Sequence, residues 1–408
     1  MNGEKRMKKL LLLGGSKYLL PAIEAAHNIE GGVHVITCDY LPDNVAHKYS
    51  DEYHNVSIVD KEAVLNLARE LKIDGILSFA TDPGVVTAAY VAEKMGLVSS
   101  TSYESVRIMQ NKDLFRDFLE KNGFNCPKHI GYDNKEDAMK GVNEFSLPIV
   151  IKPVDSAGSK GVTKVTEKQE IEQAIDCAFE NSISKKIIIE QFIALEGCQS
   201  GSDSFVKDGK LVFASFDSQF YDLNAPNSFT PAAMCYPSNM PMEKHIELRA
   251  EIQRLVDLLG IRTTILNIEC RVGTDGKAYL MEVSPRAGGN RVTEILRLAT
   301  GTDLIKNDVR NALGLSVEDM TDPVYDGSYT RVILHSYNSG TVKDIVIDKQ
   351  FEEKYVVEKD IWVKPGDKVN AFTGANQSLG ILFLKFPTWE IAKQYVTNMD
   401  SWLKIVLN

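Results

Sequence analysis

Two glutamates in the second half of the chain have the spacing of opposed residues in a β-hairpin. The segment 266–284 alternates apolar and polar residues on either side of Asp275-Gly276, a pair typical of a two-residue type I′ turn. If that pair forms the loop, Glu269 faces Glu282, and both side chains lie on one face of the ribbon. Opposed Cβ atoms are about 5 Å apart, where two like charges destabilise a sheet. The pair therefore needs a compensating feature.

Three arrangements would accommodate the two carboxylates. They could share a proton, with one pKa raised; they could both be hydrated on an exposed face; or they could bind a hard divalent cation, which prefers oxygen ligands. The hairpin alone does not decide among them. The same register predicts three further pairs: Asn267 opposite Ser284 on the glutamates' face, and Ile268 opposite Val283 and Cys270 opposite Met281 on the other face.

Residues suited to binding phosphate lie upstream of the hairpin. Lys152 ends a buried strand, and the segment 155–162 that follows is rich in glycine and serine and contains a lysine. Small residues let backbone N–H groups approach anionic oxygens, and lysine adds a point charge. The segment lacks the GxxxxGK[ST] spacing of a Walker A loop. A phosphate-binding loop and an ordinary hairpin tip are both consistent with it.

Two further segments carry weaker signals. Lys112 begins a helix over 111–122, and by composition alone it is a hydrated surface lysine. The apolar run 187–189 predicts a buried strand that continues through 190–193 toward the next sheet. A backbone that passes between two lobes can hydrogen-bond the edge of a purine. Neither segment predicts a function by itself.

The elements that position these residues follow from the hydrophobic pattern. The first hundred residues alternate strands and helices, which predicts a parallel sheet with helices on both faces. Later strands are separated by Gly and Asp turns, as in antiparallel sheets. The predicted strands are 10–13, 33–36, 75–79, 148–151, 163–165, 187–189, 204–206 and 211–213, and the predicted helices are 61–72, 83–94, 111–122, 243–259 and 388–404, with a strand-rich tail from 328 and a turn at 365–367.

The bulk composition narrows the class of protein. The chain has 408 residues and a net charge of -10, which argues against nucleic acid or an anionic membrane as partner. Six cysteines occur singly, as expected for reduced thiols. The apolar run that starts at Leu10 stops at Gly14, too short for the roughly 7–15-residue core of a signal peptide. We therefore expect a cytoplasmic protein.

Taken in chain order, these segments resemble the ATP-grasp superfamily. The resemblance covers about residues 8–315, and its five motifs are loose singly but specific together; they are Asn111-Lys112, Lys152-Pro153, the loop 156–162, the segment 188–193 and the glutamate pair. It implies an α/β and α+β fold with four domains: an N-terminal α/β domain (1–100), a linker helix with the small lobe (101–195), the large lobe with the metal hairpin (196–318) and a β-rich C-terminal domain (319–408). That last domain looks like the one in amino-acid ligases and their carbamoyl-phosphate-synthetase-like relatives.

The resemblance also implies roles for single residues around ATP. Lys112 and Lys152 would hold the phosphates, and the closing loop would contain Ser159, Lys160 and Gly161. Adenine would be read by the segment Glu190, Gln191, Phe192 and Ile193, through the Glu190 carbonyl and the Ile193 N–H. The ribose ligand would be Glu196 or Gln199; the spacing favours Gln199, which departs from the usual glutamate.

The remaining roles concern metal and substrate. Glu269 and Glu282 would bind magnesium, with Ser284 in place of the asparagine common in the family. Arg286 would stabilise an acyl phosphate, and Arg291 would add charge for the substrate carboxylate. Outside the motifs, Asp82 and His34 are each either substrate contacts or structural residues.

The resemblance implies an ADP-forming ligase that activates a carboxylate as an acyl phosphate and couples it to an amine. Its cofactors would be ATP and two Mg²⁺ ions, which Mn²⁺ could replace. The partners would be small molecules such as amino acids, without nucleic acid or membrane, and a homodimer stays open. Alternative functions are a phosphotransferase, a purine-pathway enzyme like phosphoribosylglycinamide synthetase and a non-catalytic ATP-binding module. The sequence at 284–289 lacks the extended motif of biotin carboxylases.

Overall fold

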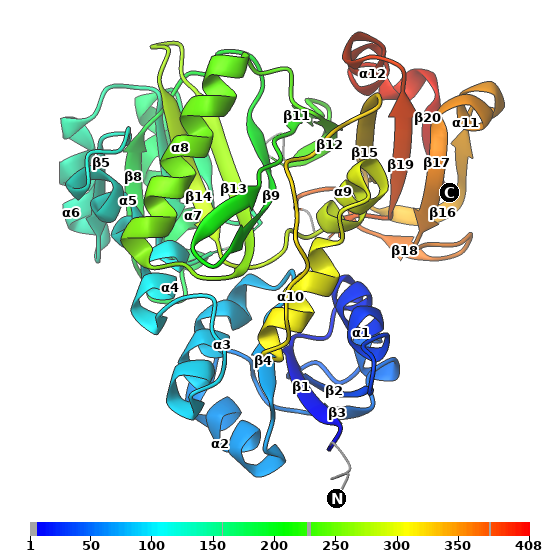
Figure 1. The fold of residues 1–408 in the computed structure, drawn as a ribbon. Coiled ribbons are helices and arrows are strands. Elements are labelled where there is room, and N and C mark those ends of the chain that lie inside the picture. Colours follow the sequence, from blue (N-terminus) through cyan, green and yellow to red (C-terminus); the bar gives the residue numbers. More distant parts are fainter. Residues whose placement is uncertain (1–5, 157, 227–229, 375–376) are drawn as a thin grey trace, which may run out of the picture.

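A computed structural model places the chain in an N-terminal α/β domain, two central lobes and a C-terminal β-rich region (Figure 1). The structure describes residues 6–156, 158–226, 230–374 and 377–408. The α/β and α+β class predicted from the hydrophobic pattern is confirmed. Among these described residues, no helix has both the length and the apolar character that crossing a membrane requires.

The N-terminal domain is built around a parallel sheet, as predicted. Its elements are β1 (Lys8–Leu13), α1 (Leu20–His27), β2 (Val33–Cys38), β3 (Glu52–His54), α2 (Lys61–Leu71), β4 (Gly75–Leu77) and α3 (Asp82–Met95). The strand order is β3-β2-β1-β4. In β1, Leu10 and Leu12 pack toward α1, whereas Leu11 and Leu13 pack toward α2 and α3. The continuous apolar run reflects burial of this strand on both faces.

A later helix attaches the central region to this domain. Helix α10 (Leu304–Ala312) packs against α1 and β4, and Figure 1 shows it beside α1. Gly75 lies at the contact, where an added Cβ would be 2.3 Å from the carbonyl oxygen of Ala312. The close approach of the two backbones therefore requires glycine at this position.

The small lobe is an antiparallel sheet covered by two helices. It contains β5 (His129–Tyr132), α6 (Lys135–Gly141), β6 (Ile149–Pro153), β7 (Thr163–Val165), α7 (Ile171–Glu180) and β8 (Ile187–Gln191), and the helices α4 (Tyr103–Gln110) and α5 (Lys112–Lys121) precede it. The strand order is β5-β8-β6-β7. Ile149, Ile151, Ile187 and Ile189 form the core with α6 and α7. Strand β8 is therefore an inner strand, paired on both sides.

The large lobe is a second antiparallel sheet, and it carries the hairpin. Its elements are β9 (Ser200–Lys207), β10 (Lys210–Phe213), α8 (Met242–Leu259), β13 (Thr264–Val272) and β14 (Ala278–Ser284). The strand order is β10-β9-β13-β14. The apolar stripe of α8, which includes Leu248, Ile252 and Leu255, is buried against this sheet. The helix was predicted over nearly the same residues.

The C-terminal region shares a sheet with the large lobe. It contains β15 (Ser328–Leu334), β16 (Gly340–Ile347), α11 (Lys349–Tyr355), β17 (Val356–Ile361), β18 (Lys368–Val369), β19 (Gly380–Phe386), α12 (Trp389–Val396) and β20 (Leu403–Leu407), and α9 (Val292–Thr300) of the central region packs against β15. Two strands from before the predicted boundary at 318/319, β11 (Ser218–Tyr221) and β12 (Pro231–Tyr236), belong to the five-stranded sheet β11-β12-β15-β19-β17. Strands β16, β18 and β20 form a separate three-stranded sheet. The predicted final helix over 388–404 is wrong in extent, because α12 ends at Val396 and the chain returns as β20.

Candidate active site

The hairpin brings the two glutamates together. Glu269 pairs with Glu282 in the register of β13 and β14, and Asn267 pairs with Ser284, both as predicted. The loop differs from the prediction, since β13 already ends at Val272 and five residues separate the strands. The prediction of a two-residue turn at 275–276 is therefore wrong.

A β-bulge explains why the glutamates still face each other. The register shifts between Glu269 and Cys270, so that Cys270 faces Leu280 rather than the predicted Met281. One extra residue in β14 compensates for the odd number of residues in the loop. Bulges of this kind redirect side chains and are frequent beside active sites.

The two carboxylates have different electrostatic environments. Burial and the neighbouring Glu282 raise the pKa of Glu269 well above its usual range. Partial burial would also raise the pKa of Glu282, whose side chain is 46% exposed, but Lys112 and Lys152 outweigh it and lower that pKa. The Nζ atom of Lys112 lies 3.2 Å from Glu282 Oε1. The nearby cations thus outweigh burial at Glu282 but not at Glu269, and a bound cation would stabilise the ionised form of both carboxylates.

The protein alone supplies few metal ligands at this point. Among the described residues, no cluster of three or more His, Cys, Asp or Glu side chains is arranged to hold a metal ion. Mg²⁺ typically binds through one or two carboxylates, water and substrate phosphates. Glu269 and Glu282 fit that mode because they offer two opposed carboxylates beside lysines suited to phosphate.

Both lysines of the resemblance lie at this site. Lys112 is the first residue of α5, and its Nζ donates to Ser156 O at 2.9 Å, at the start of the glycine-serine loop. Lys152 ends β6, and its Nζ lies 2.9 Å from Glu190 Oε2. Burial lowers the pKa of Lys152, against the attraction of Glu190. The hairpin, the loop and the two lysines therefore form one cluster.

The side chain of Glu190 has a partner that the sequence did not indicate. Glu190 is 2% exposed and lies 2.8 Å from Arg116 Nε on its other oxygen. Burial would raise its pKa, but Arg116 and Lys152 lower it to about 2. Its backbone lies within β8, between His129 of β5 and Val150 of β6. The predicted adenine contact through the Glu190 carbonyl would therefore have to form inside a paired strand.

The residues that follow Glu190 lead out of the sheet. The N–H groups of Gln191 and Phe192 donate to Lys128 O and Pro148 O. The adenine role of Ile193 remains a prediction.

The two ribose candidates, Glu196 and Gln199, differ in exposure and in their hydrogen bonds. The carboxylate of Glu196 belongs to an exposed residue, and its N–H donates to Val272 O beside the hairpin. Gln199 is 9% exposed, and its Oε1 accepts a hydrogen bond of 2.7 Å from Arg271. Glu196 is therefore the more accessible group, and both roles stay predictions.

The glycine-serine loop needs its glycines for geometric reasons. Gly161 has a φ of +71°, and an added Cβ would be 2.8 Å from Asn181 Cβ. Ser159 also has a positive φ, of +60°. Lys160 is exposed, and Ala157 lies outside the described residues.

Arg286 is held by the N-terminal domain. Its Nε and Nη2 donate to the two oxygens of Asp82 at 2.7 Å each, in a fork that fixes the guanidinium. Ser284 Oγ also donates to Asp82, at 3.3 Å, and accepts from Gln110 at 2.7 Å. Asp82 therefore joins the first turn of α3 to the residues predicted to bind metal and acyl phosphate.

The substrate role of Arg291 stays a prediction. Its guanidinium lies within 3.2 Å of the carboxylates of Glu294, Glu358 and Asp360, so its charge is already compensated. Arg331 is a different case, which the sequence did not single out. It is 3% exposed, donates to Gly289 O at 2.9 Å, and its Nε has no hydrogen-bond partner among the described residues.

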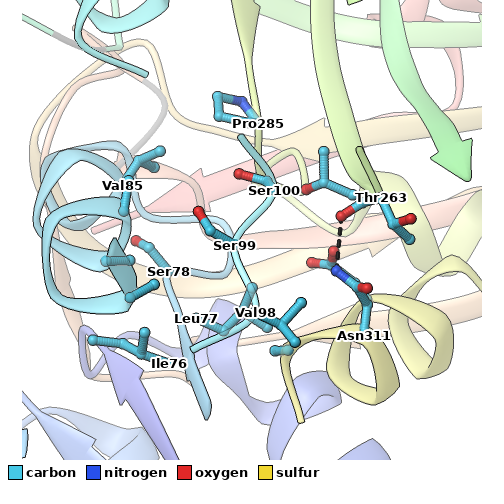
Figure 2. Close-up of a pocket in the computed structure, with 16 residues that line it drawn as sticks. Ile76, Leu77, Ser78, Val85, Val98, Ser99, Ser100, Thr263, Pro285 and Asn311 are labelled. Carbon is cyan, nitrogen blue, oxygen red and sulfur yellow. Dashed lines mark hydrogen bonds between the residues drawn. The ribbon is translucent and has the colours of Figure 1, made fainter. Parts of the chain in front are cut away.

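A small cavity borders the site at Pro285, between Ser284 and Arg286. It has a volume of about 40 Å³ and lies between the N-terminal domain and the start of β13, lined by Ser78, Ser99 and Thr263 among others (Figure 2). A water needs about 10–15 Å³ by this measure, so the space holds a few waters and not a nucleotide. Asp308 also lines it, and burial raises the pKa of Asp308 to about 7.

Comparison with known proteins identifies a known domain family in the central part of the chain. Residues 145–294 match the family described as the ATP-grasp domain. This range includes Lys152, the glycine-serine loop, Glu190 and both hairpin glutamates. The chain therefore contains an ATP-grasp domain, and its fold is the ATP-grasp fold.

Curated relatives include carbamoyl phosphate synthase large chains. The chain is 27% identical over 264 residues to that of Thermoanaerobacter sp. (strain X514), covering 64% of this chain and 24% of that protein. It is 22% identical over 330 residues to the C-terminal section of the Aquifex aeolicus large chain, covering 78% of this chain and 60% of that protein. The chain spans about a quarter of the length of the first of these.

Similar solved structures extend over nearly the whole chain. L-amino acid ligase from Bacillus licheniformis has a TM-score of 0.80 at 22% identity, covering 99% of this chain and 100% of that one. Phosphoribosylglycinamide synthetase from Anaerococcus prevotii has a TM-score of 0.73 at 19% sequence identity, and the match covers 98% of this chain and 100% of that one. A third structure is the biotin carboxylase domain of Hydrogenobacter thermophilus 2-oxoglutarate carboxylase, solved with MgADP. It has a TM-score of 0.73 at 15% sequence identity, and the match covers 99% of this chain and 91% of that one. These likenesses show the shared fold.

Proposed function

We propose that this protein is an ADP-forming ligase that activates a carboxylate with Mg-ATP as an acyl phosphate and couples it to an amine. The substrates would be amino acids or similar small metabolites. The observation that carries the proposal is the opposition of Glu269 and Glu282 beside Lys112, whose Nζ is 3.2 Å from Glu282 Oε1. The MgADP bound to a protein of the same fold supports it.

The cationic side chains have a clear task in such a reaction. A carboxylate must approach the γ-phosphoryl group of ATP, so two anions have to be brought together. Lys112 and Lys152 would hold the phosphates, and Arg286 would face the negative charge that develops on the transferred group. Asp82 holds Arg286 in a fixed fork and so orients it before substrate binds.

Glu269 and Glu282 would hold the magnesium ions, with Ser284 as a weaker neighbour. Bound Mg²⁺ would neutralise charge on the phosphate oxygens. The raised pKa of Glu269 reflects burial and a like charge, and a cation would favour its ionised form.

Two further features support a sheltered reaction with a small carboxylate. The loop with Gly161 would close over the phosphates and exclude water, which would otherwise hydrolyse an acyl phosphate. Arg331 is a second candidate to attract a substrate anion, because its Nε has no hydrogen-bond partner among the described residues, whereas Arg291 already contacts three carboxylates.

The proposal is tested with purified protein, Mg-ATP and pools of amino acids and other carboxylates. We expect release of ADP and phosphate that depends on a carboxylate and an amine together. Release of AMP would contradict the acyl-phosphate route. A phosphorylated product without an amide would indicate a phosphotransferase, and ATP binding without turnover in any pool would indicate a non-catalytic module.

A further inference from the structure

Arg116 is the largest of the fully buried side chains among the described residues. It lies in α5, four residues after Lys112, so the two side chains project from the same side of the helix. Its Nε is 2.8 Å from Glu190 Oε1, and its Nη1 donates to Met281 O at 2.8 Å. One guanidinium therefore contacts both the small lobe and the hairpin.

Stability does not explain this arrangement well. Burying a guanidinium and a carboxylate costs several kcal/mol of desolvation, and apolar replacements of similar volume are often equally stable. The Nη2 atom of Arg116 also has no hydrogen-bond partner among the described residues. A buried charge with an incomplete set of partners is expected where it serves the site.

The first contact bears on Lys152. Glu190 lies 2.9 Å from Lys152 Nζ and 2.8 Å from Arg116 Nε, so one carboxylate is shared by two cations. The three groups together carry a net charge of +1. Without Arg116, Glu190 and Lys152 would form a neutral pair, and Lys152 would attract a phosphate less strongly.

The second contact bears on Glu282. Met281 is the residue that the β-bulge leaves without a partner in β13. Its carbonyl accepts the hydrogen bond of Arg116, so Arg116 fixes the bulge next to Glu282. The bulge is the feature that keeps Glu282 opposite Glu269 despite the five-residue loop.

We infer that Arg116 is a positioning residue of the nucleotide site, which acts through Glu190 on Lys152 and through the Met281 carbonyl on Glu282. This role rests on the proposed function. It predicts two separable effects of replacing Arg116: a lower affinity for phosphate and a greater requirement for Mg²⁺. Arg116→Met removes both effects. Arg116→Lys keeps a charge near Glu190 but, as a point donor, cannot contact Glu190 and Met281 with the geometry of the guanidinium.

The first experiment compares the affinities for ATP and for adenosine by calorimetry. For Arg116→Met we expect ATP binding to weaken on the order of tenfold to a hundredfold, as for loss of a charged hydrogen bond, with adenosine binding unchanged. The matched control is Lys121→Met, which removes a cation from an exposed position of the same helix and should leave both affinities unchanged. If Arg116 had a purely structural role, Arg116→Met would lower the affinities for ATP and adenosine equally, and that result would overturn the inference.

The second experiment measures ADP release as a function of Mg²⁺ concentration. Arg116→Lys should keep the wild-type ratio of ATP to adenosine affinity and require several-fold more Mg²⁺ for half-maximal rate. An unchanged Mg²⁺ requirement would overturn the role at Glu282, and this variant decides the question if Arg116→Met does not fold. Failure of the wild-type protein to bind ATP would refute the proposed function, whereas normal wild-type binding with an unchanged Arg116→Met would refute only the role of Arg116.

Discussion

Replacing Glu282 with glutamine tests the metal site and the charge balance around it. The change removes one carboxylate of the opposed pair and keeps the size of the side chain. Loss of a group that merely orients a metal ligand costs about 10- to 100-fold in metal affinity or activity. Loss of a ligand should cost more, so we expect ADP formation to fall by more than about 100-fold.

The same replacement should leave the fold nearly as stable as before. With both carboxylates ionised and about 5 Å apart, at an effective dielectric constant of about 20, the repulsion between the two glutamates is about 3 kcal/mol. The attraction of Glu282 to Lys112, at 3.2 Å, is about 5 kcal/mol on the same basis. Both values are reduced by water because the Glu282 side chain is 46% exposed. The two losses have opposite signs, so the net change in the free energy of unfolding should be about 1–2 kcal/mol at most.

The assay combines ADP release, titration with Mg²⁺ and thermal unfolding. Glu172→Gln is the matched control, because Glu172 forms a surface ion pair with Lys135 in the small lobe, away from the hairpin. Retained turnover in Glu282→Gln would refute the metal assignment. Unfolding of the variant under conditions where the control is stable would refute the estimate that the two charge effects nearly cancel.

Three further changes test other parts of the structure. Burial raises the pKa of Asp308 from 3.8 to about 7, so between about pH 4 and 7 the folded state holds a proton that the unfolded state has lost. The contribution of this group to the free energy of unfolding therefore falls by up to about 1.4 kcal/mol per pH unit as pH rises through this range. Asp308→Asn should flatten the pH dependence of thermal unfolding, and an unchanged slope would contradict the shift. Gly75→Ala should lower the free energy of unfolding by about 1–3 kcal/mol or more, because the alanine Cβ would be 2.3 Å from Ala312 O. Denaturant titration measures this change, and a variant as stable as the wild type would show that the two backbones can separate easily. Asp82→Asn should lower kcat about tenfold or more with little change in ATP affinity, since it weakens the fork that holds Arg286; a loss confined to ATP binding would speak against that role.

The sequence predicted the pairing of the glutamates but not the way in which it is reached. Alternation and the Asp275-Gly276 pair indicated a hairpin, and the pairing of Glu269 with Glu282 is confirmed. The longer loop and the bulge at Met281 each shift the register by one residue, and the two shifts cancel. A bulge has no distinct residue signature, so periodicity could not reveal it.

Contacts between distant segments were also beyond the sequence. Arg116 lies within the predicted helix over 111–122, and a charged residue in a helix is usually exposed, yet Arg116 is fully buried against Glu190. The ion pair joins residues 74 positions apart, since 190 minus 116 is 74. The fork between Asp82 and Arg286 spans an even longer separation. Only the folded arrangement of three sheets brings these groups together.

The five-stranded sheet limits how the chain can be shortened. Strand β12 hydrogen-bonds with β15, so a fragment ending near residue 318 would leave the backbone of an inner strand open to solvent. Such an edge readily pairs with another chain and promotes aggregation. Expression of the ATP-grasp portion alone is therefore a poor route to a well-behaved sample, and fragments for biophysical work should retain the strands through β19.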